Sequence, residues 1–310
     1  MVQASERRRR RGPLDPLECV LCLVHGRLQS LRGDLGLEAR MLGYIASLVA
    51  KWSSRTDVFV ESYDYMLRLL GELDPYRSRK ERLNAAAAKI VAGLSIDEMD
   101  AAELLSLMAA ANGVDIDMPG YRVDDSRVFR GLRDQPQWLG VSAEEAAERV
   151  AAAERIVVVL DNAGEAVVDV VAASRLAGLA GARLYLVARS LPYEVDVTVR
   201  EVVEIRDRYA PRAEVVGTGG RFPVFSPRSS PEARRLLQGR NTVVLAKGIA
   251  NLEAYMDNPS SVADGVFPLF LLRAKCGPLA QFFDVALADP VAAAGDWVLA
   301  RLREKLGERI

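Results

Sequence analysis

The clearest hydrophobic pattern in the chain is an apolar run near its middle. Residues 156–160 are all aliphatic, and four of the five are β-branched. Such a run is typical of a strand that is buried on both faces. The polar pair Asp161 and Asn162 ends the run, and apolar residues at helical spacing begin after Gly164. The pattern therefore predicts a strand, a polar turn and a helix, in that order.

The same alternation continues to the end of the chain. Because helices separate successive strands, we expect βαβ crossovers and strands that run mostly parallel. We predict an α/β fold with a mostly parallel, Rossmann-like sheet and flanking helices. The predicted strands are 155–160, 183–188, 213–217, 242–246 and 267–272, and the predicted helices are 164–178, 196–208, 231–238, 249–257 and 291–307.

The chain before residue 155 shows helical spacing and no convincing strand. Ser95 and Ser142 are each followed three residues later by a glutamate, which is the form of a capping box that starts a helix. The pair Asn112 and Gly113 is a typical helix end. We predict three regions: a disordered basic tail (1–12), a helical N-terminal domain (13–141) and an α/β domain (142–310).

Composition limits the kinds of partner that the protein can have. The chain has 310 residues, half of them hydrophobic, so it is long enough for a sizeable core. A net charge of -1 argues against bulk electrostatic binding of nucleic acid, and the basic tail is better explained as a solvated segment. No uncharged apolar run reaches the about eighteen residues of a membrane span. The N-terminus lacks the apolar core of a signal peptide, so we predict a cytoplasmic protein.

Polar residues follow each predicted strand of the α/β region. In an open α/β sheet the carboxyl ends of parallel strands share one edge, where ligands bind. A carboxylate beside an amide suits a hard divalent cation, whereas a lysine, a glycine-rich turn and helix N-termini suit an anion. The sequence therefore predicts a cation site beside an anion site. The residues concerned are Asp161, Asn162, Arg189, Ser190, Asp196, Gly217, Gly219, Gly220, Lys247, Gly248, Asn251 and Glu253.

Each of these residues also has a purely structural explanation. Asp161, Asn162 and Asp196 are residue types that cap helices, and a helix is predicted close to each of them. Lys247 has the alternative of an ordinary strand-end cation, and Glu253 that of a solvated side chain. The functional interpretation rests on their collection at one edge of the sheet rather than on any single residue.

Several enzyme classes lack their sequence signals here. The turn after the first strand has no GxGxxG, the chain has no GxxxxGK[ST], and the first strand lacks the DxDx[TV] of a haloacid-type phosphatase. His25 is the only histidine and lies far from the predicted sheet in sequence, which argues against a Ser–His–Asp set. Attack of a metal-activated water on phosphorus fits the residues that remain.

The three cysteines have two explanations. Cys19 and Cys22 are spaced to share one face of a helix, but no second such pair follows, and a zinc site needs four ligands. Buried structural thiols are the default interpretation. A metal or redox role for these two cysteines and Cys276 is the alternative.

Five short segments carry a family resemblance. They are Leu160–Glu165 (LDNAGE), Ala246–Glu253 (AKGIANLE), Leu271–Cys276 (LLRAKC), Asp74–Tyr76 (DPY) and Ala111–Asp115 (ANGVD). With them the chain resembles the damage-control phosphatases, long catalogued as a domain of unknown function, whose relatives include proteins labelled acidic-residue methyltransferases. The pair Cys19 and Cys22 is similar to the compact archaeal-type branch, and the resemblance covers residues 17–290.

The resemblance implies a helical N-terminal domain, an α/β domain and metal-dependent hydrolysis of small phosphomonoesters such as sugar phosphates. The metal ligands of the family fall on Asp161, Asn162 and Asp196. The expected cofactor is Mg²⁺, Mn²⁺, Co²⁺ or Ni²⁺. The family lysine falls on Lys247, near the substrate phosphate. The chain departs from the family at Arg189, in a segment where a glycine-rich turn is common.

The remaining roles concern the substrate. Backbone amides near Gly219 are expected to help Lys247 neutralise the phosphate, and Glu253 to position the attacking water or a substrate hydroxyl. Further substrate-binding candidates are Asn112, Asp115 and Asn251.

Two alternatives to a phosphatase stay open at this point. One is a carboxyl methyltransferase that uses S-adenosylmethionine, although the first turn has only one glycine and the second strand ends without an acid. The other is a protein that binds a phosphorylated metabolite without turning it over. The expected partner is a small phosphorylated metabolite, with no membrane and no specific nucleic acid, and the sequence allows an oligomer without specifying one.

Overall fold

A computed structural model describes residues 16–51, 54–114, 122, 124–125 and 129–307. The predicted basic tail and the candidate Asp115 lie outside these residues. Within the described part of the chain, no helix has both the length and the apolar character needed to cross a membrane.

The described residues form one seven-stranded sheet, with the strand order β1-β7-β6-β5-β2-β3-β4. All neighbouring strands run parallel except β6 and β7, which are antiparallel. The predicted α/β fold with a mostly parallel sheet is therefore confirmed. The strands are β1 (Gln137–Leu139), β2 (Arg155–Val159), β3 (Arg183–Ala188), β4 (Glu214–Gly217), β5 (Thr242–Lys247), β6 (Val266–Arg273) and β7 (Pro290–Ala294).

Two strands were missed by the sequence pattern. The prediction of no strand before residue 155 is wrong, because the three residues of β1 pair in parallel with β7. The helix predicted at 291–307 begins only at Gly295, because β7 occupies the preceding residues. All five residues of β7 are buried. A short run of small apolar residues fits a buried strand as well as a helix, so periodicity did not separate the two.

Side chains of β2 alternate between two hydrophobic cores. Ile156 and Val158 belong to the core on one face of the sheet, and Val157 and Val159 belong to the core on the other. The first core also contains residues of α5 (Arg77–Val91), α6 (Ala101–Ala111), α7 (Ala143–Ala151), α8 (Glu165–Ala180) and α9 (Val199–Tyr209). The second contains residues of α10 (Pro231–Arg235), α11 (Gly248–Asp257), α12 (Gly277–Phe283) and α13 (Gly295–Leu306).

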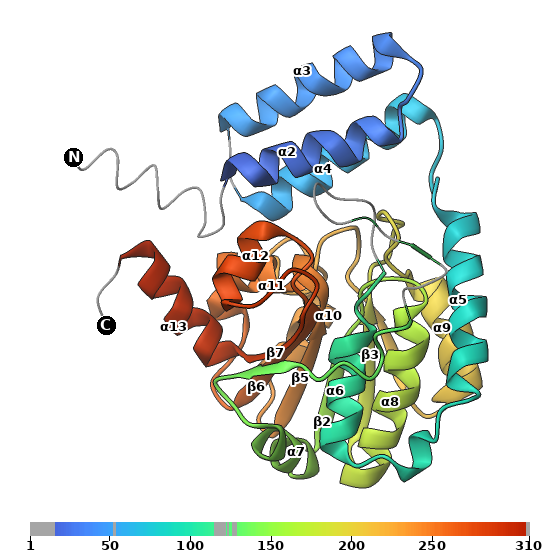
Figure 1. Ribbon diagram of the computed structural model, residues 1–310, viewed down its shortest axis with the longest axis vertical. Helices are drawn as coiled ribbons and strands as arrows, with labels where there is room; N and C mark the ends of the chain where they lie inside the picture. Colours follow the sequence, from blue (N-terminus) through green and yellow to red (C-terminus); the bar gives the residue numbers. More distant parts are fainter. Residues whose placement is uncertain (1–15, 52–53, 115–121, 123, 126–128, 308–310) are drawn as a thin grey trace.

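The first three described helices pack around a third core, to which Tyr193 and Phe222 also contribute. They are α2 (Pro16–Gln29), α3 (Leu35–Lys51) and α4 (Arg55–Leu70), and their shared core includes Leu23, Met41, Ile45, Tyr63 and Met66. Figure 1 shows α2, α3 and α4 lying across one end of the sheet, and we call these three helices the roof. Since α5 and α6 contribute to a core of the sheet, the predicted boundary at residue 141 does not coincide with a change of core, and it stays a prediction.

The two predicted capping boxes have different outcomes. Ser142 accepts a hydrogen bond from the Glu145 N–H (3.1 Å) and donates its own N–H to the Glu145 carboxylate (2.9 Å), as predicted. Ser95 makes no such cap and precedes only a short 3₁₀ turn, Ile96–Glu98. The box that starts α6 is formed instead by Asp100 and Glu103. The helix predicted at Ser95 therefore begins only at Ala101.

Replacing the two serines with alanine tests this difference. We expect Ser142→Ala to lower the free energy of unfolding by about 1 kcal/mol, because one helix N–H loses its acceptor. Ser95→Ala, the matched control at an exposed position, is expected to change it by less than about 0.5 kcal/mol. Urea denaturation measures both, and equal losses would show that the capping bond at Ser142 is not the stabilising contact.

Candidate functional site

Backbone hydrogen bonds bring the two aspartates of the site together. Asp161 and Asn162 follow β2, and the loop after β3 folds back over them. The Val197 N–H donates to the Asp161 carbonyl (2.8 Å), and the Ala163 N–H donates to the Val195 carbonyl (2.8 Å). Asn162 and Asp196 are consequently paired in an isolated antiparallel bridge. The predicted trio Asp161, Asn162 and Asp196 therefore lies in one place, and each of these residues is at most 6% exposed.

The trio does not serve to cap helices. The N-cap of α8 is Gly164, which has no side-chain capping bond, and the Asp161 carboxylate instead accepts from the side-chain amides of Asn162 (2.8 Å) and Asn112 (3.2 Å). Helix α9 begins after Thr198, whose N–H donates to Glu201 (2.7 Å). The capping explanation of Asp161, Asn162 and Asp196 is therefore wrong.

Gly248 allows the carboxylate of Asp161 to lie directly against the backbone at the start of α11. The residue has a φ of 75°, in the left-handed region, and a Cβ placed on it would overlap the Asp161 carboxylate. Only glycine provides both this backbone conformation and this close approach. Of the sequence pair Lys247 and Gly248, it is therefore the glycine that contacts Asp161.

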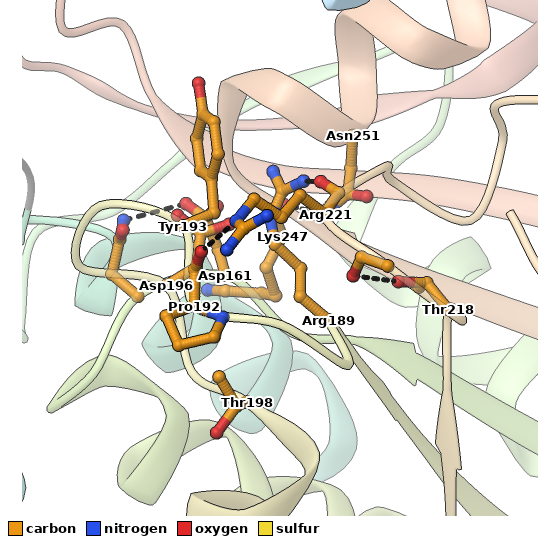
Figure 2. Close-up of polar contacts among 12 residues, drawn as sticks. Asp161, Arg189, Pro192, Tyr193, Asp196, Thr198, Thr218, Arg221, Lys247 and Asn251 are labelled. Atoms are coloured by element: carbon orange, nitrogen blue, oxygen red, sulfur yellow. Dashed lines mark hydrogen bonds and ion pairs between the residues drawn. The ribbon is translucent and has the colours of Figure 1, made fainter. Parts of the chain in front are cut away.

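Arg189 directly follows β3, where it contacts Asp196 of the trio (Figure 2). Its guanidinium forms an ion pair with Asp196, donates to the Arg221 carbonyl and lies over the Tyr193 ring, with 4.3 Å between Cζ and the ring centroid. Burial opposes the charge of this guanidinium, but Asp196, Tyr193 and Asp161 together outweigh burial, so the pKa of Arg189 is raised. The side chain is a fixed cation on the wall of the site.

A cavity of about 270 Å³ lies between the sheet edge and the roof. Asp161, Asn162, Arg189 and Asp196 line one wall, which we call the polar wall. Two cations of the roof line the cavity as well, and each forms an ion pair with a carboxylate from the α/β part of the chain. These pairs are Arg27 with Glu194, and Arg55 with Glu253.

Glu253 lines the cavity, as its predicted role requires. It lies on α11, and the ion pair with Arg55 of α4 holds its carboxylate. Burial raises the pKa of Glu253, while the charge of Arg55 partly opposes this rise.

Lys247 lies away from the described lining of the cavity. Its ammonium is fully buried, 3.1 Å from the Asp169 carboxylate of α8, and it donates to the Met108 carbonyl of α6. Burial raises the pKa of Asp169 to about 7, although the charge of Lys247 opposes this rise. The geometry gives no support to the predicted contact between Lys247 and a phosphate.

Three further candidates also lie outside the cavity lining that the structure describes. The side-chain amide of Asn112 donates to both carboxylate oxygens of Glu165 (2.9 and 2.8 Å) as well as to Asp161, so Asn112 supports the polar wall from behind. Asn251 donates to the Lys247 carbonyl (2.8 Å). The Gly219 N–H donates to the Ser190 hydroxyl (2.8 Å), so this amide already has an acceptor.

The polar wall has the chemistry of a site for a divalent cation. Asp161 and Asp196 supply carboxylates and Asn162 supplies an amide oxygen, which are ligands that hard cations prefer. In the described part of the chain, no group of three or more His, Cys, Asp or Glu side chains is arranged to hold a metal ion. A cation on this wall would therefore use the Asn162 oxygen together with two carboxylates, and it would compete with Arg189 for Asp196.

Sequence reasoning gave no role to four residues of the cavity. Arg27 and Arg55 come from α2 and α4, and no pattern linked those helices to the strand ends. Tyr193 and Glu194 lie in the loop that covers the trio, which has no regular pattern. Arg189 was noted at a strand end, and this position was the signal for its place in the site.

Fold and site together define an α/β protein with an oxygen-rich ligand site at the carboxyl edge of its sheet, under a helical roof. A family model described as the damage-control phosphatase ARMT1-like domain matches residues 18–291, and the chain belongs to this family. The family suggested by the sequence segments is thus confirmed.

Individual relatives agree with the family. The chain is 26% identical over 295 residues to a damage-control phosphatase of Archaeoglobus fulgidus, which covers 91% of this chain and 98% of the relative. It is 24% identical over 282 residues to a damage-control phosphatase of Pyrococcus horikoshii, covering 85% and 92%. The crystal structure of a DUF89 family protein from Pyrococcus horikoshii matches the fold with a TM-score of 0.71 and 22% identity, covering 90% of this chain and 98% of that chain.

Substitution of Gly248 tests its close contact with the Asp161 carboxylate. Gly71 is a matched control, since its φ of 67° is similar and no atom lies within 4 Å of a Cβ placed on it. We expect Gly71→Ala to lower the free energy of unfolding by about 1 kcal/mol, from backbone strain alone. Gly248→Ala is expected to cost a further ~1–3 kcal/mol, because its methyl group overlaps the Asp161 carboxylate.

Urea denaturation of the double variant Gly248→Ala/Asp161→Ala separates strain from overlap. We expect the extra loss at Gly248 to shrink when the carboxylate is removed, which is a coupling between the two positions. Equal effects of Gly248→Ala in both backgrounds would contradict the close contact.

Proposed function

We propose that the protein is a metal-dependent phosphatase that hydrolyses a small phosphomonoester in the cavity under the roof. The observation that carries this proposal is the meeting of Asp161, Asn162, Asp196 and Arg189 on one wall of the cavity. Two relatives of similar length are named damage-control phosphatases, which supports the reaction class.

Asp161, Asn162 and Asp196 are the residues that would hold the metal ion. A bound divalent cation polarises a phosphoryl oxygen and makes a bound water more acidic. The all-oxygen donor set suits Mg²⁺ or Mn²⁺, and Co²⁺ and Ni²⁺ are the other candidates. The amides of Asn112 and Asn162 orient the Asp161 carboxylate through the hydrogen bonds described above.

Arg189 takes the role of phosphate ligand in this proposal, in place of Lys247. A guanidinium presents two parallel N–H donors to a phosphate and stays charged. The plane of Arg189 is held by the Tyr193 ring and the Arg221 carbonyl, and its charge lies on the polar wall. The Lys247 ammonium is held in the interior by Asp169.

Glu253 remains the candidate for positioning the water or a substrate hydroxyl. It lines the same cavity, and burial raises its pKa above that of an exposed glutamate, which favours proton uptake by this carboxyl group. No observation on the described residues favours the methyltransferase alternative, because β2 leads into Asp161 and Asn162 rather than a glycine-rich turn, and Arg189 follows β3.

Phosphate release from a panel of phosphomonoesters tests the proposal, with Mg²⁺, Mn²⁺, Co²⁺, Ni²⁺ or a chelator. We expect release that requires a metal and falls by more than about 100-fold in Asp161→Ala, since even outer partners of metal ligands contribute ~10–100-fold. Asp264→Ala, at an exposed aspartate, is the matched control and should keep wild-type release.

A second readout does not depend on turnover. Titration with the metal alone, followed by calorimetry, should show binding to the wild type and much weaker binding to Asp161→Ala. Metal-independent release, or wild-type release by Asp161→Ala, would overturn the metal assignment. Folded protein that binds phosphate esters but releases no phosphate with any metal would instead support the non-catalytic binding protein.

Arg189→Lys tests the phosphate ligand. We expect this variant to bind inorganic phosphate about 10–100-fold more weakly in the presence of the metal, because a bidentate contact to a charged group is lost. Arg228→Lys is the matched control, since Arg228 pairs with Asp57 and Glu61 and is half exposed. Calorimetry measures the affinity. Unchanged phosphate binding by Arg189→Lys would overturn Arg189 as the phosphate ligand and favour Lys247 again.

A further inference from the structure

The lining of the cavity outside the polar wall, which we call the apolar half, is mostly hydrophobic. Aliphatic, aromatic and proline side chains from α2, α4, α11 and α12 line it. They include Leu21, Leu23, Phe59, Val60, Ile249 and Pro278. Ligand sites often combine such walls with a few polar groups that fix orientation. Here the polar groups that suit a phosphate belong to the polar wall, and most of the remaining lining is apolar.

The two arginines of this apolar half already have partners. Arg27 is paired with Glu194, and it also donates to the Ser62 hydroxyl (3.1 Å) and the Phe59 carbonyl (2.9 Å). Arg55 is paired with Glu253. A buried hydroxyl without a hydrogen-bond partner costs about 1–3 kcal/mol. Glu18, Thr56 and Tyr193 are the other charged or hydroxyl side chains of this lining, and the Tyr193 hydroxyl already accepts from Arg27 (3.3 Å). The lining therefore offers few partners for the several hydroxyls of a sugar.

The cysteines extend the apolar surface. Cys19, Cys22 and Cys276 all line the cavity, and none of them is in a disulfide. Burial raises the pKa of the Cys276 thiol to about 12, so this side chain is a neutral thiol at neutral pH. A neutral cysteine behaves as a small hydrophobic side chain. The three cysteines therefore favour contact with hydrocarbon over contact with a polar group.

The apolar surface continues along α2 toward solvent. Leu21 lines the cavity and is 55% exposed, and Leu17, one helical turn earlier, is 67% exposed. Residues four apart share one face of a helix. A body longer than the cavity would therefore meet leucine side chains as it emerges.

We infer that the substrate is a phosphomonoester with an apolar leaving group, an alkyl or aryl phosphate whose hydrocarbon body lies against α2, α4 and α11. This inference rests on the proposed phosphatase function and names the substrate class of the same site. In the reaction the oxygen of water bonds to phosphorus, the bond between phosphorus and the leaving oxygen breaks, and that oxygen takes up a proton. The products are inorganic phosphate and an alcohol or phenol. The cavity of about 270 Å³ lies near the lower end of the ~300–1,000 Å³ typical of small-molecule sites, which suits a body of this kind.

A series of ethyl, butyl and hexyl phosphate tests the leaving group, with glucose 6-phosphate as the polar comparison and the best metal from the panel. We expect kcat/KM to rise by up to about fourfold for each added methylene that enters the apolar half, and hexyl phosphate to exceed glucose 6-phosphate by more than about tenfold. Phenyl phosphate should lie near hexyl phosphate.

A variant of the exposed leucine locates the effect. Leu21→Ser is expected to lower the ratio of kcat/KM for hexyl over ethyl phosphate by about fivefold or more, because part of the surface that contacts the outer methylenes is lost. Leu35→Ser is the matched control, since Leu35 lies on α3, is 81% exposed and does not line the cavity in the part of the chain that the structure describes. Competitive inhibition by ethyl- and hexylphosphonate should follow the same order, which gives a readout of binding that does not depend on the chemical step.

The outcomes separate this inference from the proposed function. Turnover of glucose 6-phosphate equal to or above that of hexyl phosphate, or a flat chain-length series, would overturn the apolar leaving group and leave the phosphatase intact. An unchanged hexyl-to-ethyl ratio in Leu21→Ser would overturn the placement of the body along α2. Release from no ester with any metal would overturn the proposed function, and this inference with it.

Discussion

The structure of the site depends on the burial of one carboxylate. Asp161 is only 5% exposed, and a buried charge is stable only where hydrogen bonds and opposite charges compensate for lost water. Two side-chain amides bond to this carboxylate, a glycine replaces the side chain that would collide with it, and the loop after β3 closes over it through backbone hydrogen bonds. Each of these features comes from a different segment of the chain.

A second layer of buried charge supports the first. Behind the polar wall, Glu165, Asp169, Lys247 and Lys275 are all buried, with lysine and carboxylate charges facing one another. Lys275 donates to the Val114 carbonyl (2.7 Å), and Lys247 contacts both α6 and α8. Removal of one member of such a set leaves an uncompensated charge in the interior. The AKG and AKC segments thus hold helices and strands together beneath the site.

The sequence predicted the sheet and the trio because both follow from local patterns. Buried strands give continuous apolar runs, and parallel strands bring their polar ends together, so Asp161, Asn162 and Asp196 were among the polar residues expected at one edge. The family resemblance then singled out these three as a set. The direction of a side chain is not a local property. Lys247 has the position of a strand-end ligand. However, its ammonium points into the interior, where it contacts Asp169 and the Met108 carbonyl, which are distant in sequence. The cavity wall formed by α2 and α4 was hidden for the same reason, since its contacts join segments far apart along the chain.

Burial of Cys276 affects how the protein withstands oxidants. Thiolates, not thiols, react with peroxides and alkylating agents, and a pKa raised to about 12 keeps almost no thiolate at neutral pH. Conversion to a sulfenic or sulfinic acid would place polar oxygens on a mostly apolar part of the cavity lining. The burial that makes this part of the cavity hydrophobic therefore also protects Cys276 from oxidation, because it suppresses the thiolate through which this side chain would react.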